Sequence, residues 1–292
     1  MADFLSLLQS LDDTPIIREN YVRAPFPYPG SKARSLDKIL PHLPYKSRYC
    51  EPFGGTGSVL LSRRESRIEI FNDRYSGVTC FFRVIRDKEK CNALVERLSI
   101  CIHSREEFIW SRDTWKNCED EVERAARWFY TICKSFGAQG RNFGRGTKST
   151  AQFTNTFWGR IENIFPCHQR LKNVQIENQD WRQCLKDFDS PDMVWYIDPP
   201  YYQYAQGMYE CELKKEDHEE LLERIQSLKG FVALSGYENR LYDSYKWDSI
   251  HSWELQNQGV GLAYTDTNNL EEFEGTIGRT KSKETLYIKE NS

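Results

Sequence analysis

Residues 193–201 read MVWYIDPPY, five β-prone apolar residues followed at once by an acidic residue, two prolines and a tyrosine. The apolar run predicts a strand. Pro199 and Pro200 end it, because proline has no N–H to donate to a sheet. We therefore expect Asp198 to lie where a parallel strand ends, at the edge where α/β sheets bind ligands.

The four residues from Asp198 to Tyr201 are also the sharpest chemical signal in the chain. The two prolines remove two N–H donors, so this turn presents carbonyl oxygens and a carboxylate without competing donors. Tyr201 adds a flat aromatic face. Acceptors beside an aromatic ring suit a planar group that carries an amino group, such as adenine. The alternative interpretation is an ordinary Pro-Pro turn after a strand.

Strands and helices alternate on both sides of an irregular, basic middle region. The predicted strands are residues 48–50, 68–73, 193–197, 231–235, 251–255 and 285–290, and the predicted helices are residues 34–42, 59–64, 75–86 and 216–229. Residues 88–135 are expected to be mostly helical from their 3.6-residue spacing of apolar positions. Residues 135–156 are rich in Gly, Ser, Thr and Asn, which predicts a loop or hairpin. This alternation predicts one doubly wound α/β domain interrupted by a second module.

A glycine-rich turn, EPFGGTGS at residues 51–58, joins a predicted strand to a predicted helix. Glycine lets the chain turn tightly and lets the backbone approach a ligand. The turn is not a P-loop, since no Gly-Lys-Ser/Thr follows, and Leu60 stands where the dinucleotide fingerprint needs a small residue. Asp73 ends the next strand, about twenty residues on, where it would accept hydrogen bonds from ribose hydroxyls or cap a helix.

The charge of the chain is unevenly distributed. Its 292 residues include 40 Lys and Arg against 43 Asp and Glu. Residues 124–161 nevertheless contain seven basic residues and no acidic one. An acidic protein with one basic stretch favours a polyanion that contacts one face, although a solvated surface gives the same composition.

Composition excludes several protein classes. Hydrophobic residues make up 39% of the chain, so wholesale disorder is excluded. No apolar run approaches the roughly 18 residues that span a bilayer. The start lacks the basic region of a signal peptide and predicts a short amphipathic helix with Phe4, Leu5, Leu8 and Leu11 facing inward. The nine cysteines and five histidines lack metal-ligand spacing, which favours reduced thiols in a cytoplasm and argues against a metal-centred mechanism.

Several motifs in one order resemble a known family, the Dam-type, alpha-class DNA adenine-N6 methyltransferases. The motifs are FPYPGSK (26–32), CEPFGGTGSVLL (50–61), FND (71–73), DPPY (198–201) and, at the carboxyl-terminal end, RTKSKETLYI (279–288). The resemblance implies a Rossmann-like class I methyltransferase sheet with an inserted, mostly helical target-recognition domain. It divides the chain into a cofactor-binding half (1–87), the insert (88–175) and a half that carries DPPY (176–292).

The same resemblance implies S-adenosylmethionine as the methyl donor. The cofactor-binding residues that it implies are Tyr28, Gly30, Lys32, Glu51, Pro52, Phe53, Gly54, Gly55, Gly57, Asp73, Asp180, Trp181 and Asp198. The turn at 51–57 would lie against the methionine part, Asp73 would hold the ribose, and Asp180 with Trp181 would face the adenine. Pro29, Ser31 and Trp181 depart from the family's usual residues.

The expected catalytic residues are Asp198, Pro199, Pro200 and Tyr201. Hydrogen bonds from an adenine amine to the Asp198 carboxylate and the Pro199 carbonyl would localise the nitrogen lone pair toward a methyl group about 3–3.5 Å away. The carboxylate would also offset the positive charge that develops on nitrogen. Tyr201 would stack on a base flipped out of the helix. The sulfonium supplies the electrophile, so no metal is expected.

The basic insert is expected to bind double-stranded DNA, and no membrane partner is expected. The candidate DNA-binding residues are Arg141, Asn142, Phe143, Arg145 and Lys148. Cations would position phosphates, while Arg and Asn would read base edges in the major groove. Phe143 would either wedge into the space left by a flipped base or pack in the core. We expect a cytoplasmic monomer encoded by a bacterium or phage, with a dimer as the alternative.

Other functions stay open at this point. Methylation of cytosine N4 in DNA or of adenine in RNA uses similar motifs, and a catalytically silent DNA-binding relative would keep the fold. A metal-dependent nuclease is a further alternative, since Pro191-Asp192 with Glu212-Leu213-Lys214 loosely imitates a PD…ExK pattern. In this chain the second half of that pattern opens a predicted helix rather than a strand.

Overall fold

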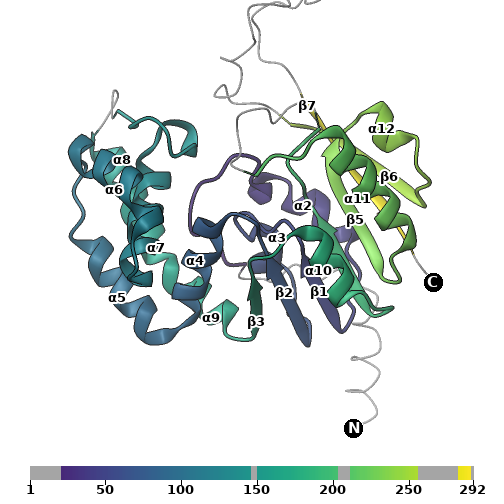
Figure 1. Ribbon diagram of the computed structural model, residues 1–292, viewed down its shortest axis with the longest axis horizontal. Helices are drawn as coiled ribbons and strands as arrows, with labels where there is room; N and C mark the ends of the chain where they lie inside the picture. The colour runs from purple at the N-terminus through teal and green to yellow at the C-terminus, as the bar shows by residue number, and fades with distance from the viewer. Residues whose placement is uncertain (1–20, 146–149, 203–210, 256–281, 291–292) are drawn as a thin grey trace, which may run out of the picture.

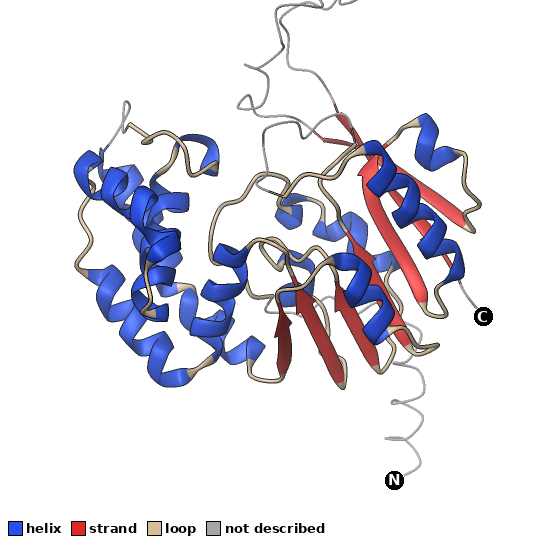
Figure 2. Ribbon diagram, viewed as in Figure 1, coloured by secondary structure: helices blue, strands red, loops and turns tan. Residues whose placement is uncertain are grey.

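The computed structural model describes residues 21–145, 150–202, 211–255 and 282–290. The predicted amino-terminal helix lies outside these residues. Within them, a twisted sheet is covered by helices on both faces, and a further group of helices lies beyond one edge of the sheet (Figures 1 and 2). The α/β class and the helical insertion predicted from the sequence are both present.

The sheet of the described residues has seven strands in the order β3-β2-β1-β4-β5-β7-β6. The strands are β1 (Arg48–Glu51), β2 (Ile68–Asn72), β3 (Val174–Glu177), β4 (Met193–Ile197), β5 (Phe231–Tyr237), β6 (Ser249–Leu255) and β7 (Ser282–Lys289). Strands β3, β2, β1, β4 and β5 run parallel, whereas β7 is antiparallel to both β5 and β6. The order reverses between β1 and β4, and such a switch point is where open α/β sheets bind ligands.

The register brings two turns together at this switch point. Cys50 on β1 lies opposite Trp195 on β4, so Glu51 and Asp198 both follow within three residues at the same edge. The glycine turn after β1 and the Asp-Pro-Pro-Tyr turn after β4 therefore leave neighbouring strands side by side. The predicted position of Asp198 at the carboxyl edge is confirmed.

Strand β4 is buried along its whole length. Val194 and Tyr196 pack into one hydrophobic core, and Met193, Trp195 and Ile197 pack into a second core on the other face. Side chains alternate between faces along a strand, so a strand covered on both sides must be apolar at every position. This explains why MVWYI has no polar residue.

Helices contribute side chains to both hydrophobic cores and form most of the insertion. The helices are α2 (Leu36–Ile39), α3 (Ser58–Ser62), α4 (Ser76–Arg86), α5 (Lys88–Ser99), α6 (Arg105–Thr114), α7 (Glu121–Lys134), α8 (Thr150–Glu162), α9 (Ile164–Leu171), α10 (Trp181–Phe188), α11 (Lys215–Ser227) and α12 (Arg240–Asp243), with 3-10 turns η1 (Lys32–Arg34), η2 (Leu40–His42), η3 (Trp115–Asn117) and η4 (Phe136–Ala138). Helices α5 to α8 gather beyond the β3 edge, at the left of Figure 1, and α10 and α11 lie across one face of the sheet.

The prediction of a loop or hairpin over residues 135–156 is partly wrong. A bridge between Ser135 and Phe143 closes a hairpin-like loop, but helix α8 already begins at Thr150. Its first seven residues, TAQFTNT, are rich in Thr, Gln and Asn, which hides the helix from a composition-based prediction, and the helix is held by Phe157 and Ile161, which are buried in the insertion. Strand β3 and helix α10 are further elements that the sequence prediction missed.

Candidate active site

The glycine turn after β1 is shaped by glycines at two kinds of position. Gly55 and Gly57 have φ of 50° and 66°, a left-handed conformation that favours glycine. Gly54 is required for a different reason, since a Cβ there would lie 2.2 Å from the Phe71 ring. A Cβ on Gly55 would meet no atom within 4 Å, so there is open space beside the turn at this residue.

Asp73 braces this turn. Its carboxylate accepts hydrogen bonds from the backbone N–H groups of Gly55 (2.8 Å) and Tyr75 (2.7 Å). Burial raises the pKa of Asp73 to about 6, while the two amide hydrogen bonds favour the ionised form. The carboxylate has further lone pairs that can accept hydrogen bonds from a ligand hydroxyl. The hydrogen bond from a ribose to Asp73 stays a prediction.

The segment at residues 26–32 connects the two turns. The Ser31 hydroxyl lies 3.2 Å from both the Thr56 and the Ser58 hydroxyls in the glycine turn. The next residue, Lys32, donates to the Asp198 carboxylate at 2.6 Å and to the Gly30 carbonyl at 2.8 Å. Two adjacent side chains thus contact the two turns that the sequence singled out.

Asp198 has one paired and one unpaired oxygen. Oδ2 accepts from Lys32, whereas Oδ1 is buried and has no hydrogen-bond partner among the described residues. Burial raises the pKa of Asp198 to about 6, and the Lys32 ammonium opposes this shift. A buried acceptor without a partner is costly unless a ligand completes it, so Oδ1 is suited to receive a ligand N–H.

Tyr201 is held at both its ring and its hydroxyl. Its ring packs edge-on against Tyr237, with centroids 4.6 Å apart, and the Lys32 ammonium lies 4.9 Å from the ring centroid. Its hydroxyl donates to Glu284 at 2.6 Å. Glu284, on β7, is a site residue that the sequence analysis missed, and the only signal for it was the resemblance of residues 279–288 to a family terminus.

The other predicted cofactor residues lie around the glycine turn. Glu51 is buried and accepts a hydrogen bond from Tyr49 at 2.7 Å; burial raises the pKa of Glu51 to about 8, so the group is protonated at neutral pH. The Phe53 and Trp181 rings lie 6.2 Å apart, which brings the amino-terminal end of α10 beside the turn. Asp180 caps that helix by accepting from the Arg182 amide.

Two further predicted residues have structural roles in the same region. The Pro52 carbonyl accepts a hydrogen bond from the Asn72 side chain at 2.8 Å. Tyr28 packs against the core of the sheet. Pro199 and Pro200 follow Asp198, the first residue after β4, as expected.

The predicted DNA-binding residues lie on the loop between α7 and α8. Arg141, Asn142 and Arg145 are exposed, while Lys148 is outside the described residues. The Phe143 ring is already engaged in packing, with the His103 ring at 4.6 Å and the Arg105 guanidinium at 5.0 Å. The exposed aromatic residue of this loop is Phe136, with 61% of its surface accessible.

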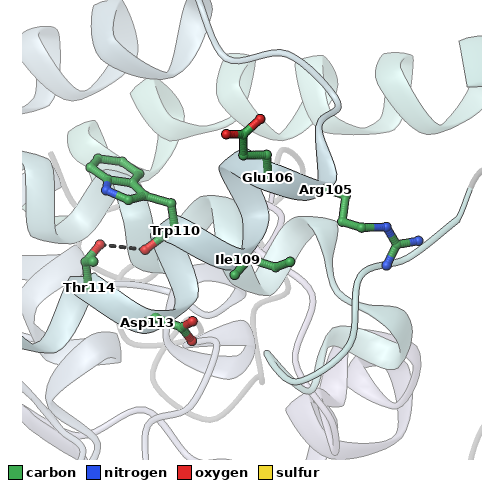
Figure 3. Close-up of a pocket in the computed structure, with 6 residues that line it drawn as sticks. All are labelled: Arg105, Glu106, Ile109, Trp110, Asp113 and Thr114. Carbon is green, nitrogen blue, oxygen red and sulfur yellow. Dashed lines mark hydrogen bonds between the residues drawn. The ribbon is translucent and has the colours of Figure 1, made fainter.

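A separate pocket lies on the insertion and is lined by side chains of α6 alone (Figure 3). Trp110 and Ile109 are its large apolar lining residues, and the Arg127 guanidinium stacks on the Trp110 ring at 3.9 Å. None of the residues around Asp198 lines this pocket, so it is distinct from the site at the sheet edge.

The described residues contain neither a metal-binding group of side chains nor a membrane-spanning helix. No three His, Cys, Asp or Glu side chains are grouped there as a metal ion would require. None of the helices in that part of the chain combines the length and apolar content needed to cross a membrane.

The sheet order, the antiparallel β7 and the two turns at the switch point define a Rossmann-like methyltransferase fold. Residues 28–258 match the family described as D12 class N6 adenine-specific DNA methyltransferase, and the chain belongs to this family. Curated proteins named DNA adenine methylase, from Salmonella typhi and Salmonella typhimurium, are each 25% identical to it over 183 residues. These alignments cover 61% of the chain and 65% of each relative, less than two thirds of the relatives' length.

Proposed function

We propose that this protein transfers a methyl group from S-adenosylmethionine to the exocyclic amine of adenine in double-stranded DNA. The observation that carries this proposal is the state of Asp198: Oδ2 accepts from Lys32, while Oδ1 is buried and no residue in the described ranges donates a hydrogen bond to it. Membership of the D12 class supports the reaction class.

The residues around the glycine turn fit the proposed cofactor. The space beside Gly55 is open, and the acidic side chains of Asp73 and Asp198 are suited to a ligand that carries ribose hydroxyls and a sulfonium cation. We assign the methionine part to residues 51–57 with Tyr28, and the adenine to Asp180 and Trp181. When bound, the cofactor supplies the electrophilic methyl group.

The chemistry assigned to the protein is largely positioning. Asp198 Oδ1 and the Pro199 carbonyl each accept a hydrogen bond from one N–H of the target amine. These two hydrogen bonds localise the lone pair of the amine nitrogen. The carboxylate then stabilises the positive charge that develops on the nitrogen. Lys32 holds Oδ2 and thereby fixes the rotation of the carboxylate, and Tyr201 provides an aromatic surface for the base.

The DNA partner is assigned to the loop between α7 and α8. Its exposed Arg141, Asn142 and Arg145 suit phosphates and base edges. The target base must leave the duplex to reach Asp198, at a cost of a few kcal/mol. All nine cysteines are free, which fits the reducing cytoplasm that we propose as the location.

The test is to express the protein in a host that lacks adenine methylation and to map modified bases by single-molecule sequencing. Wild-type protein and a control, Asp37→Ala, should produce N6-methyladenine at one sequence motif; Asp37 is an exposed carboxylate, 66% accessible. Asp198→Ala should reduce methylation by roughly 10²–10³-fold or more. Methylated cytosine would overturn the choice of base, and unmodified DNA in the presence of folded protein would overturn the proposed reaction.

A further inference from the structure

Glu284 is buried beside the Asp-Pro-Pro-Tyr turn, although it lies 83 residues from Tyr201 in the sequence. Only 2% of its surface is accessible. It enters the site because β7 pairs with β5, the strand beside β4. A buried carboxylate is costly unless its oxygens are satisfied, so its partners indicate what it does.

Both oxygens of Glu284 have partners. Oε1 accepts from the Tyr201 hydroxyl at 2.6 Å and lies 3.6 Å from the Lys32 ammonium. Oε2 accepts from the Ser35 hydroxyl at 2.8 Å, and Ser35 in turn accepts from the Trp253 indole at 3.3 Å. The carboxylate is therefore held in one orientation from two sides.

Tyr201 depends on this carboxylate for its position. Its ring contacts Lys32 and Tyr237, but both are contacts to the aromatic ring. Its hydroxyl hydrogen bond to Glu284 sets how far the ring can rotate and tilt. Since Tyr201 follows Asp198 by three residues, a displaced ring would also displace the turn.

Lys32 stands between two carboxylates. Its ammonium lies 2.6 Å from Asp198 Oδ2 and 3.6 Å from Glu284 Oε1. The ammonium is therefore shared, and Glu284 sets part of the electrostatic environment of Asp198. The closer distance keeps Asp198 as the principal partner and leaves its Oδ1 for the substrate.

We propose that Glu284 is a positioning residue of this methyltransferase site, which orients the Tyr201 ring through the phenol hydroxyl and shares the Lys32 ammonium with Asp198. The proposal rests on the proposed function. Glu284 contacts neither substrate nor cofactor in this assignment and acts through Tyr201 and Lys32. Rigid support of this kind matters because a displacement of a catalytic group by about 1 Å can lower the rate of the reaction by about 10²-fold.

The charge of Glu284 provides a second, independent consequence. The titratable and charged groups that act on or are acted on by Asp198 are Lys32, Glu51, Tyr196, Tyr201, Tyr242 and Glu284. Among the shifts in the pKa of Asp198, burial raises it most, Lys32 lowers it and Glu284 raises it. Glu284→Gln keeps an acceptor for Tyr201 and removes the negative charge, so it should lower the pKa of Asp198.

The experiment compares Glu284→Gln, Glu284→Ala, Tyr201→Phe and the double variant Tyr201→Phe/Glu284→Ala. Glu238→Gln is the matched control, since Glu238 is half-exposed and pairs with Lys283 at the surface. Steady-state kcat and the KM values for DNA and for the cofactor are measured across pH, and the Asp198 carboxyl is titrated by carbon-13 NMR.

Glu284→Ala should lower kcat by about 10- to 100-fold, with a smaller change in KM for the cofactor. The double variant should be no slower than the slower single variant, because both substitutions break one contact. Glu284→Gln should keep most of kcat at neutral pH, and both the acid limb of the pH profile and the NMR titration should move to lower pH.

Wild-type kcat in folded Glu284→Ala, or additive losses in the double variant, would overturn the proposal. An unmoved Asp198 titration in Glu284→Gln would also overturn it, even if the alanine variant did not fold. If the wild-type protein does not methylate DNA, the proposed reaction fails, and the NMR titration still decides whether Glu284 acts on Asp198.

Discussion

The buried acidic residues around the site differ in the hydrogen-bond donors that their carboxyl groups have, and therefore in pKa. Asp73 accepts from two backbone amides, Asp198 from a lysine, and Glu51 from a tyrosine hydroxyl and the Leu60 backbone. Neutral donors such as these offset less of the desolvation cost of a carboxylate than an ammonium does. Burial therefore raises the pKa of Glu51 to about 8, but that of Asp198 only to about 6.

This difference predicts a pH-dependent stability for Glu51. The pKa of its carboxyl is near 4.5 in an unfolded chain and about 8 in the folded one, so between these values the folded state binds a proton that the unfolded state does not. The stabilisation is complete below pH 4.5 and is lost as pH rises through 8. Relative to Glu51→Gln, the wild-type protein should lose thermal stability from pH 5 to pH 8; melting temperatures that change in parallel would contradict this.

At the scale of elements, close packing between helices explains which glycines are needed. Gly77 on α4 faces Trp128 on α7, and a Cβ on Gly77 would lie 2.2 Å from the indole nitrogen. Gly159 on α8 is exposed, and a Cβ there would meet nothing within 4 Å. The same substitution should thus have opposite effects at two helical positions.

Gly77→Ala should reduce the free energy of unfolding by about 1–3 kcal/mol, because the added methyl forces α4 and α7 apart. Gly159→Ala is the matched control and should be neutral or stabilising by up to about 1 kcal/mol, since alanine favours a helix. Denaturant unfolding measures both. Equal effects of the two substitutions would show that the α4–α7 contact is looser than described.

The loop between α7 and α8 is the segment that we propose binds DNA, and this assignment can be tested by substitution. Arg145→Ala should weaken binding to duplex DNA and reduce the slope of log K against log salt by about 1, as expected for the loss of one phosphate contact. Lys229→Ala is the control, because Lys229 is exposed just before β5, at the amino-terminal ends of the parallel strands and away from the α7–α8 loop. A salt slope that responds to Lys229 rather than Arg145 would move the DNA-binding face.

At the scale of the whole molecule, the insertion and the sheet share one core. Phe26, Phe71, Trp128 and Leu171 belong to a single buried cluster, although they come from four separate parts of the chain. A buried ion pair adds to this connection: Arg170 of α9 donates to Glu69 of β2 at 2.5 and 2.8 Å and to the Leu60 carbonyl at 2.7 Å. We therefore expect the described parts to unfold as one cooperative unit.

Arg170→Ala should lower the free energy of unfolding by roughly 3–5 kcal/mol, because it leaves the buried Glu69 short of a partner. Arg63 is also buried and donates to Glu69 at 3.2 Å, so Arg170→Met and Glu69→Leu combined with Arg63→Met should recover part of that loss by removing all three charges. Lys90→Ala, which breaks an exposed pair with Glu121, is the control and should have little effect. Two separate thermal transitions in the wild-type protein would contradict the shared core.

The sequence by itself determined the order of strands and helices near the motifs, the two turns and the end of β4. These features depend on short-range physics: apolar runs, glycine conformations, and prolines that cannot donate to a sheet. The late pairing of residues 251–255 and 285–290 was predicted in the same way and is confirmed.

Only the tertiary structure decided which distant side chains complete the site. Glu284 reaches Tyr201 because β7 runs antiparallel beside β5, and Phe143 packs against His103 because the 135–143 loop folds back on the insertion. Neither contact leaves a local pattern, since strand register and packing depend on residues far apart in the chain. The protonation of Glu51 is likewise a product of burial, which no single stretch of sequence encodes.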